Sequence, residues 1–299
     1  MKLFLNLTWG LILLSCSSPP RNFVDYEIFP ILPPQDENIE ASGLYKYDNH
    51  FYIINDEDDK IYELNKQDSV YQAKIVYTID LPPEITSLKT HKLDMEGITY
   101  CNNKFYILDE RDRLIYKLNL ENKKIDVLQL TTQDYLSHNP KGFSVISNFA
   151  FEGIACDEKS QILYVANEKR PMMIYAVSLK TEKILDVITF PDESFFNLFI
   201  QDISDLYFYN SHLYFINRSK SRIDRLNLQT KEVEASINIA PFEHRDYKTS
   251  IGTPFIKMAE GLVIDDQYIY LVLDANGLTP KDQTRPLSSL VVIKKPPSF

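Results

Sequence analysis

The stretch KFYILDERDRLIYKLNL, Lys104 to Leu120, decides the fold because near copies of it recur along the chain. In each full copy two apolar and aromatic runs flank a charged turn, and the central tyrosines lie 50 to 58 residues apart. The copies are HFYIINDEDDKIYELNK from His50, ILYVANEKRPMMIYAVSL from Ile162, HLYFINRSKSRIDRLNL from His212 and the partial copy YIYLVLDANG from Tyr268. A repeat of this length indicates an architecture in which each unit packs on its neighbours.

A second echo precedes each copy, reading ASGLYKY, MEGITYC, FEGIACD, ISDLYFY and AEGLVID in chain order. Only eight glycines occur in the chain, and four of them hold one position of this echo: Gly43, Gly97, Gly153 and Gly261. So selective a use of glycine predicts that the backbone requires glycine at this position, either for a positive φ or for the close approach of another segment. The fourth copy has Asp205 at this position, and Asp is among the few other residues that tolerate a positive φ.

Each repeat predicts four strands. In the first repeat these are GLYKY, FYIIN, KIYELN and AKIVYTIDL, which are short, rich in Ile, Val, Tyr and Phe, and separated by polar turns. No segment predicts a helix longer than two turns. Five repeats of four strands make an all-β fold, a five-bladed β-propeller formed by residues 23–299 as one domain. The alternative is six blades, with a degenerate blade in residues 131–148.

The last repeat lacks one strand. After GLVID and YIYLVLD, the C-terminal part offers only SSLVVIKK. We expect DYEIFPIL, Asp25 to Leu32, to supply the missing outer strand and close the ring with both ends of the chain in one blade.

The first residues predict a targeting segment rather than part of the fold. Lys2 precedes an apolar run from Leu3 to Leu14, which is too short to span a membrane. The following Ser15 and Cys16 complete a sequence that resembles a bacterial lipobox. We therefore expect a signal peptide at 1–15, lipidation of Cys16, a linker at 16–22, and anchoring to a membrane of the bacterial cell envelope, outside the cytoplasm. The alternative is an ordinary signal peptide with a chance cysteine.

Charge and cysteine content narrow the class of partner. The net charge is −10, and no stretch is rich enough in Lys and Arg for nucleic-acid binding.

Two further cysteines, Cys101 and Cys156, hold similar places in neighbouring repeats. A disulfide needs Cα atoms within about 7 Å, which adjacent blades seldom provide, so free thiols are favoured over a disulfide. Nothing indicates an oligomer, and we expect a monomer.

Polar residues should converge at one end of the propeller. The start of a first strand and the end of a second strand lie at the same end, because paired strands in a blade are antiparallel. The acids at these places are Glu40, Asp94, Glu96, Glu152, Asp202 and Glu260, together with Asp56, Glu57, Asp109, Glu110, Glu168 and Asp274. Arginines follow in the turns after the second strands, at Arg111, Arg170 and Arg218.

This composition predicts a binding site at a channel mouth. Hard carboxylate oxygens suit Ca²⁺, or alternatively Mg²⁺. Arginines suit a phosphate or carboxylate, which indicates a small anionic ester as ligand. We assign Glu96, Glu152 and Glu260 to catalysis, the three arginines to substrate binding, and Asp94, Asp109, Asp202 and Asp274 to the metal. The alternative is that many of these side chains only satisfy neighbouring backbone amides.

Other catalytic signatures are absent from the sequence. There is no G-x-S-x-G elbow, no phosphate-binding G-x-x-x-x-G-K and no H-E-x-x-H. Ser42 and Ser204 stand where other repeats have a glutamate. No histidine candidate lies near them, so we interpret both serines as structural.

The motifs DMEGITY, FEGIACDEKSQILYVANEKRP, DISDLYFYNSHLYFINRSKSRIDRLNL and KMAEGLVIDDQYIYLVLDANG resemble the esterase-like phytase family of secreted propellers. They also resemble the related SdiA-regulated (YjiK-like) propellers. The resemblance covers nearly all of the chain after the signal segment and implies hydrolysis of phosphate or carboxylic esters, with calcium as a cofactor. The competing hypothesis is a propeller without catalytic activity that binds a ligand, calcium or a protein at the same mouth.

Overall fold

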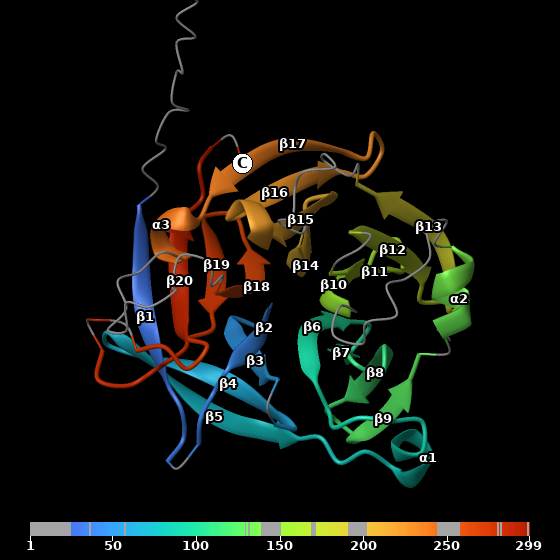
Figure 1. Ribbon diagram of the computed structural model, residues 1–299, viewed down its shortest axis with the longest axis horizontal. Helices are drawn as coiled ribbons and strands as arrows, with labels where there is room; N and C mark the ends of the chain where they lie inside the picture. The colour runs from blue at the N-terminus through green and yellow to red at the C-terminus, as the bar shows by residue number, and fades with distance from the viewer. Residues whose placement is uncertain are drawn as a thin grey trace, which may run out of the picture.

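The computed structural model describes residues 25–35, 37–56, 58–128, 130, 132–138, 151–168, 172–190, 202–243, 258–279, 281, 283–297 and 299. Within them the protein is a β-propeller whose sheets surround a central axis (Figure 1). The predicted signal segment, Cys16, Glu57 and Arg170 lie outside the described residues. No helix in the described ranges has the length and apolar character needed to cross a membrane.

Three four-stranded sheets follow one another in chain order, each built of neighbours in sequence. Their strands are β6 (Met95–Cys101), β7 (Lys104–Asp109), β8 (Leu114–Asn119) and β9 (Lys124–Val127); β10 (Phe151–Asp157), β11 (Ile162–Asn167), β12 (Met173–Ser178) and β13 (Lys183–Thr189); β14 (Ile203–Tyr209), β15 (His212–Asn217), β16 (Arg222–Asn227) and β17 (Glu232–Asn238). All pairings within these sheets are antiparallel, as the repeats predict.

The remaining strands form one eight-stranded sheet, in the order β18-β19-β20-β1-β5-β4-β3-β2. Its members are β1 (Tyr26–Leu32), β2 (Ala41–Tyr47), β3 (His50–Asn55), β4 (Lys60–Gln67), β5 (Val70–Thr78), β18 (Ala259–Ile264), β19 (Tyr268–Leu273) and β20 (Ser289–Lys294). The prediction that the N-terminal strand completes the last repeat is confirmed, because β1 pairs antiparallel with β20. A short parallel pairing of β1 with β5, at Ile31 and Leu32, joins the two halves of this sheet.

Helices are short, as expected. Those in the described ranges are α1 (Pro83–Thr86), α2 (Thr132–Ser137), α3 (Ala240–Glu243) and the 3₁₀ turn η1 (Arg218–Lys220). The stretch proposed for a sixth blade, residues 131–148, contains α2, and its remainder falls in positions that the structure does not describe, except for His138.

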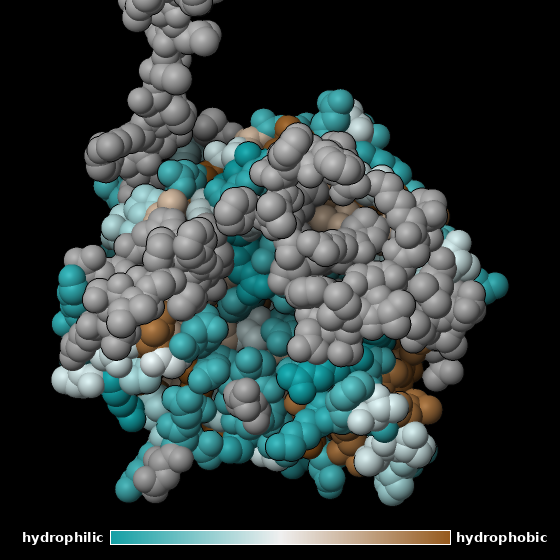
Figure 2. All heavy atoms as spheres, viewed as in Figure 1, coloured by the Kyte–Doolittle hydropathy of each residue, from teal (hydrophilic) through white to brown (hydrophobic). Residues whose placement is uncertain are grey.

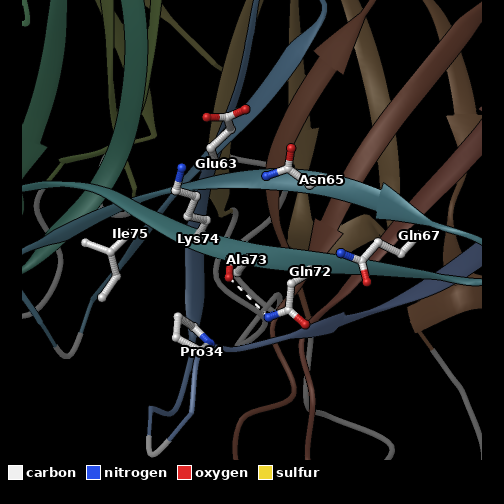
Figure 3. A pocket seen from close by; sticks show the side chains of 8 residues that line it. All are labelled: Pro34, Glu63, Asn65, Gln67, Gln72, Ala73, Lys74 and Ile75. Atoms are coloured by element: carbon white, nitrogen blue, oxygen red, sulfur yellow. Dashed lines mark hydrogen bonds between the residues drawn. The ribbon is translucent and has the colours of Figure 1, made fainter.

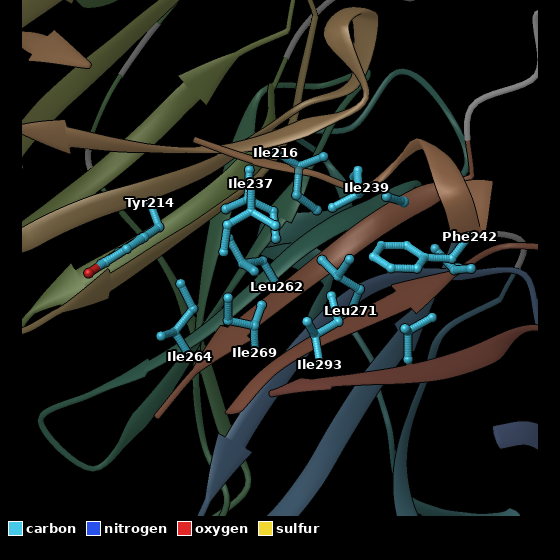
Figure 4. Close-up of a cluster of buried hydrophobic side chains, with 14 of the residues drawn as sticks. Tyr214, Ile216, Ile237, Ile239, Phe242, Leu262, Ile264, Ile269, Leu271 and Ile293 are labelled. Carbon is cyan, nitrogen blue, oxygen red and sulfur yellow. The ribbon is translucent and has the colours of Figure 1, made fainter. Parts of the chain in front are cut away.

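The inner strands β2, β6, β10, β14 and β18 contact one another in ring order, and β18 contacts β2. Apolar side chains fill the spaces between sheets. In one such layer Tyr214 and Ile216 of β15 and Ile237 of β17 pack with side chains of β18, β19 and β20 (Figure 4). The sheets therefore share their cores with their neighbours, which explains why each repeat presents the same apolar pattern.

The glycine column serves close approach rather than positive φ. Among the described glycines only Gly277 has a positive φ, and Asp205 does not have one, so that interpretation of Asp205 was wrong. A Cβ on Gly153 would lie 2.8 Å from the backbone carbonyl carbon of Asp205, and one on Gly261 would lie 2.6 Å from the Cβ of Leu44. Neighbouring inner strands thus approach too closely for a side chain. Asp205 instead accepts hydrogen bonds from the backbone N–H groups of Leu206 (2.8 Å) and Leu262 (2.7 Å).

The expectation of free thiols was wrong, because Cys101 and Cys156 form a disulfide with Cα atoms 6.1 Å apart. Both cysteines lie in inner strands, β6 and β10, which are neighbours in the ring. The expectation overlooked how closely inner strands converge near the axis, compared with the outer strands. The bond ties two sheets that are also joined by packing, by the Asn102–Gln161 hydrogen bonds and by the Lys117–Glu182 ion pair.

This bond predicts a reductant-sensitive fold. Closing a loop of 55 residues restricts the unfolded chain, so Cys156→Ser is expected to lower the free energy of unfolding by about 3 kcal/mol. Denaturant unfolding of a soluble form beginning at Arg21, with and without dithiothreitol, measures this. The wild type should lose stability on reduction and the variant should not respond; equal stability of the reduced and oxidised wild type would contradict the prediction.

Candidate functional site

A β-bulge in every inner strand positions one side chain of each repeat, and these equivalent side chains form the first column of the site. The register between first and second strands shifts between Ala41 and Gly43, and again at the equivalent place in the other four copies. The residue before the conserved glycine position falls in each bulge, where the backbone re-aims a side chain. These residues are Ser42, Glu96, Glu152, Ser204 and Glu260.

The two serines of this column have structural partners, as the sequence predicts. Ser42 donates to the backbone carbonyl of Met95, and Ser204 donates to that of Ala259 at 2.6 Å. Each serine thus bonds to the next inner strand of the ring. Glu96, Glu152 and Glu260 instead line a cavity of about 170 Å³ at the mouth.

A second column stands one residue beyond each second strand, four residues after the repeated tyrosine. It consists of Asp56, Glu110, Glu168, Arg218 and Asp274. Backbone hydrogen bonds hold it against the start of the first strand; for example, Glu110 N–H donates to the Asp94 carbonyl at 2.9 Å and Arg218 N–H to that of Asp202 at 2.9 Å. Four copies therefore place an acid at the mouth, and the fourth copy places an arginine there.

Arg218 is surrounded by carboxylates. Its guanidinium pairs with Glu260 (2.5 Å), Glu168 (3.0 Å), Asp202 (3.1 Å) and Glu152 (3.3 Å). Its side chain is only 15% exposed. These pairs engage all three nitrogens of the guanidinium. Arg218 therefore acts as an internal cation that holds together acids from three sheets of the propeller.

Glu110 is the centre of the remaining acidic groups. One oxygen from each of Asp94, Glu96 and Glu110 lies within 4.8 Å of the others, and the same holds for Glu110, Glu152 and Glu168. Burial raises the pKa of Glu96 well above its usual range, and the negative charges of Glu152 and Glu110 add to this. Such repulsion is relieved by a proton or by a bound cation.

Asp274 lies in the same cavity on the side of β2 and β18, with Glu40 and Asp56. Burial raises the pKa of the Asp274 carboxyl to about 7, and the charges of Glu40 and Asp56 add to this. Asn276 N–H donates to its Oδ2 at 2.9 Å.

Aromatic rings occupy the axis farther along the inner strands. Tyr45 of β2 meets Tyr207 of β14 with ring centroids 6.2 Å apart and Tyr100 of β6 at 6.4 Å. Strands β2 and β14 are not neighbours in the ring, so these rings meet across the axis. In the face seen in Figure 2, hydrophilic residues surround a central hollow.

A larger hollow, of about 540 Å³, lies on the outer strands β4 and β5 (Figure 3). Its lining mixes the amides of Asn65, Gln67 and Gln72 with Glu63 and Lys74. One acid and one base leave no concentration of charge, so the acidic mouth is the stronger candidate.

The predicted arginines and acids are only partly brought together. Arg111, 44% exposed, pairs with Asp94 at 2.6 Å at the edge of the Glu110 groups. Asp109 is fully buried; it accepts from Tyr116 at 2.8 Å and pairs with Lys89, and it is not among the residues that line the cavity. Asp202 pairs with Arg218 and, among the described residues, belongs to neither group of three that contains Glu110.

Glu110 and Glu168 belong to the polar residues expected to converge at the mouth, but the sequence-based assignment gave them no role. The assignment aligned Asp109 with Asp274, whereas the structure aligns Glu110 with Asp274. Counting four residues from each repeated tyrosine, Tyr106 and Tyr270 among them, identifies the correct column. The residue before it is Asn55, Asp109, Asn167 or Asn217, all buried, which serves the backbone and neighbouring side chains.

The Asp274 carboxyl predicts a pH-dependent stability. Its pKa is raised from its unfolded value to about 7, so its contribution to stability is complete below about pH 4 and is lost as the pH rises through about 7. In chelator-treated wild type, this carboxyl is expected to lower the free energy of unfolding by about 4 kcal/mol as the pH rises from about 4 to about 7, and Asp274→Asn should abolish this decrease. Denaturant titrations at several pH values compare wild type, Asp274→Asn and the exposed Asp126→Asn; a wild-type slope in Asp274→Asn would refute the assignment.

The fold and site compare with known proteins as follows. Glutaminyl cyclase of Myxococcus xanthus aligns with a TM-score of 0.54 and 11% identity over 91% of this chain and 95% of that chain. A luciferin-regenerating enzyme aligns with a TM-score of 0.48 and 11% identity over 87% and 92%. At these identities the likeness concerns the fold alone. The model of the SdiA-regulated family matches residues 49–277, and the protein therefore belongs to the SdiA-regulated family.

Proposed function

We propose that the protein is a five-bladed propeller that binds a hard divalent cation, Ca²⁺ or Mg²⁺, at the channel mouth. The observation that carries this proposal is the Glu110 arrangement, in which two groups of three carboxylates share one member within 4.8 Å. Calcium takes six to eight oxygen ligands at about 2.3–2.6 Å, and carboxylates so spaced meet around one ion.

The charge of the mouth supports a cation rather than an anion. Six acids line the cavity, namely Glu40, Asp56, Glu96, Glu152, Glu260 and Asp274, and Arg218 is the basic residue in its described lining. Arg218 is already paired with four carboxylates. The net charge is strongly negative, which favours cations in a cleft of low dielectric.

The location in the cell is part of the proposal. We infer a lipoprotein, with signal peptide 1–15, lipidated Cys16, linker 16–22 and a monomeric propeller facing outside the cytoplasm. The Cys101–Cys156 disulfide supports an oxidising compartment.

Calcium binding is tested by calorimetry on the soluble form. Glu110→Gln removes the shared ligand and is expected to weaken Ca²⁺ binding by about tenfold or more, or about 1.4 kcal/mol. Asp126→Asn, whose exposed carboxylate pairs with Lys124 at 3.0 Å, is the matched control and should bind as the wild type does. Unchanged affinity in Glu110→Gln, or no binding by the wild type, would reject the proposal.

Ester hydrolysis is the second candidate function, favoured by the raised pKa of Glu96 in a cavity. A carboxylate whose pKa is raised is a stronger base than an ordinary one, and Glu96 would take a proton from the attacking water and pass it to the oxygen of the leaving group. A bound cation would polarise the ester oxygen. Glu152 and Glu260 would orient around Arg218, and the half-exposed Arg111 would contact the anionic part of the ester.

Hydrolysis is measured as phosphate release from phytate and from p-nitrophenyl phosphate, with calcium and with chelator. Calcium-dependent release should fall by about 10²-fold or more in Glu96→Gln and persist in Asp126→Asn. Calcium binding without any release by the wild type would leave a binding propeller and exclude hydrolysis of these esters.

A further inference from the structure

Two tyrosine hydroxyls between the second and third repeats have no hydrogen-bond partner among the described residues. They belong to Tyr135 of α2 and Tyr175 of β12, which are both 0% exposed. The two ring centroids lie 5.1 Å apart in a T-shaped contact. A buried hydroxyl without a partner is costly. A ligand that accepts hydrogen bonds from both hydroxyls would therefore stabilise this part of the fold.

Tyr175 is an exception in a column of equivalent third-strand residues. Tyr62, Tyr116 and Tyr175 each pair across the sheet with the residue that follows a repeated tyrosine. The hydroxyl of Tyr62 donates to Asp58 at 2.6 Å, and that of Tyr116 donates to Asp109 at 2.8 Å. The first two repeats thus supply a carboxylate as the acceptor for this hydroxyl, and the third repeat does not.

A positive charge lies in the surroundings of Tyr175. Burial raises the pKa of the Tyr175 hydroxyl, and the charge of Arg113 opposes this. Burial lowers the pKa of Arg113, and the negative charge of Glu110 opposes this in turn. Arg113 belongs to the turn that carries Glu110, because its backbone N–H donates to the Glu110 carbonyl at 3.3 Å.

An anion suits these groups better than a water molecule does. A water that accepts from both hydroxyls must also donate its own two protons. The buried cluster that holds both rings consists of apolar and aromatic side chains, with Leu128, Phe151 and Met173 among them, and a guanidinium has donors only. A monatomic anion accepts hydrogen bonds without donating any, and it takes the least room in a packed core.

We propose that Tyr135 and Tyr175 bind a chloride ion between the second and third repeats, with Arg113 supplying positive charge. The ion does for Tyr175 what the carboxylate of Asp109 does for the equivalent tyrosine of the second repeat. It joins α2 and β12 beside the turn that carries Glu110, and so it stabilises that turn. This anion site is separate from the cation site of the proposed function.

Thermal unfolding of the soluble form beginning at Arg21 tests the proposal. Sodium chloride replaces sodium gluconate at constant ionic strength, with chelator present so that no divalent cation contributes. The unfolding midpoint of the wild type is expected to rise by about 2 °C or more at saturating chloride, because a ligand that binds only the folded state stabilises it. Tyr135→Phe and Tyr175→Phe each remove one donor and should lose this rise.

Tyr116→Phe is the matched control, because it removes the hydroxyl at the equivalent position of the second repeat. It should keep the chloride response, although it is less stable in both salts because Asp109 loses a donor. Tyr62→Phe is a second control of the same kind. In gluconate, Tyr175→Phe should be at least as stable as the wild type, because it loses no hydrogen bond.

Bromide locates the ion. Crystals grown with sodium bromide should give an anomalous scattering peak beside the hydroxyl oxygens of Tyr135 and Tyr175, and Tyr175→Phe should lack it. This peak, together with a chloride response that both phenylalanine variants lose, supports the inference. No chloride-dependent rise in the wild type, an equal rise in Tyr135→Phe and Tyr175→Phe, or density without anomalous signal, which identifies a buried water only, overturns it.

Discussion

The close approach of the inner strands around the axis is the constraint on which the rest of the structure depends. At Gly153 and Gly261 a single added methyl group would meet neighbouring backbone or Cβ atoms at less than 3 Å. Each strand meets this crowding with a glycine or Asp205 and with a bulge immediately before it. The bulge is therefore a packing solution, and its consequence is that Glu96, Glu152 and Glu260 point to the mouth. Geometry that closes the ring also builds the candidate site.

Convergence of equivalent positions concentrates like charge, and the fold offsets this in several ways. Two copies replace the bulge acid with serine, which bonds to the next strand. One copy replaces the acid of the second column with Arg218, whose guanidinium pairs with four carboxylates. The remaining acids raise one another's pKa, as at Glu96. The symmetry of the repeats concentrates carboxylates at the mouth. The copies that depart from this symmetry determine which part of the negative charge is neutralised by the protein's own side chains.

The repeats predicted the strands, their antiparallel order and the closing role of residues 25–32, because these follow from local periodicity and from the need to pair an edge. The disulfide could not be predicted in this way, since it depends on how far neighbouring inner strands converge. The wrong choice of Asp109 over Glu110 was avoidable by counting from the repeated tyrosine. The role of Arg218 could not be predicted in this way. A guanidinium in a turn suits an anionic substrate as well as it suits carboxylates of the protein, until the positions of those carboxylates are known.

Those partners decide what kind of ligand the mouth accepts. An arginine that reaches solvent attracts phosphate. An arginine enclosed by Glu152, Glu168, Asp202 and Glu260 instead uses its N–H donors in ion pairs within the protein. If Arg218 were released to bind an anion, four buried carboxylates would lose their guanidinium partner. This loss costs far more free energy than one new ion pair contributes. An anionic substrate therefore needs a cation between itself and the acids, or contact with the half-exposed Arg111 at the rim. Under the proposed function, cation binding would therefore precede any activity at the acids of this mouth, and only contact with Arg111 would not require it.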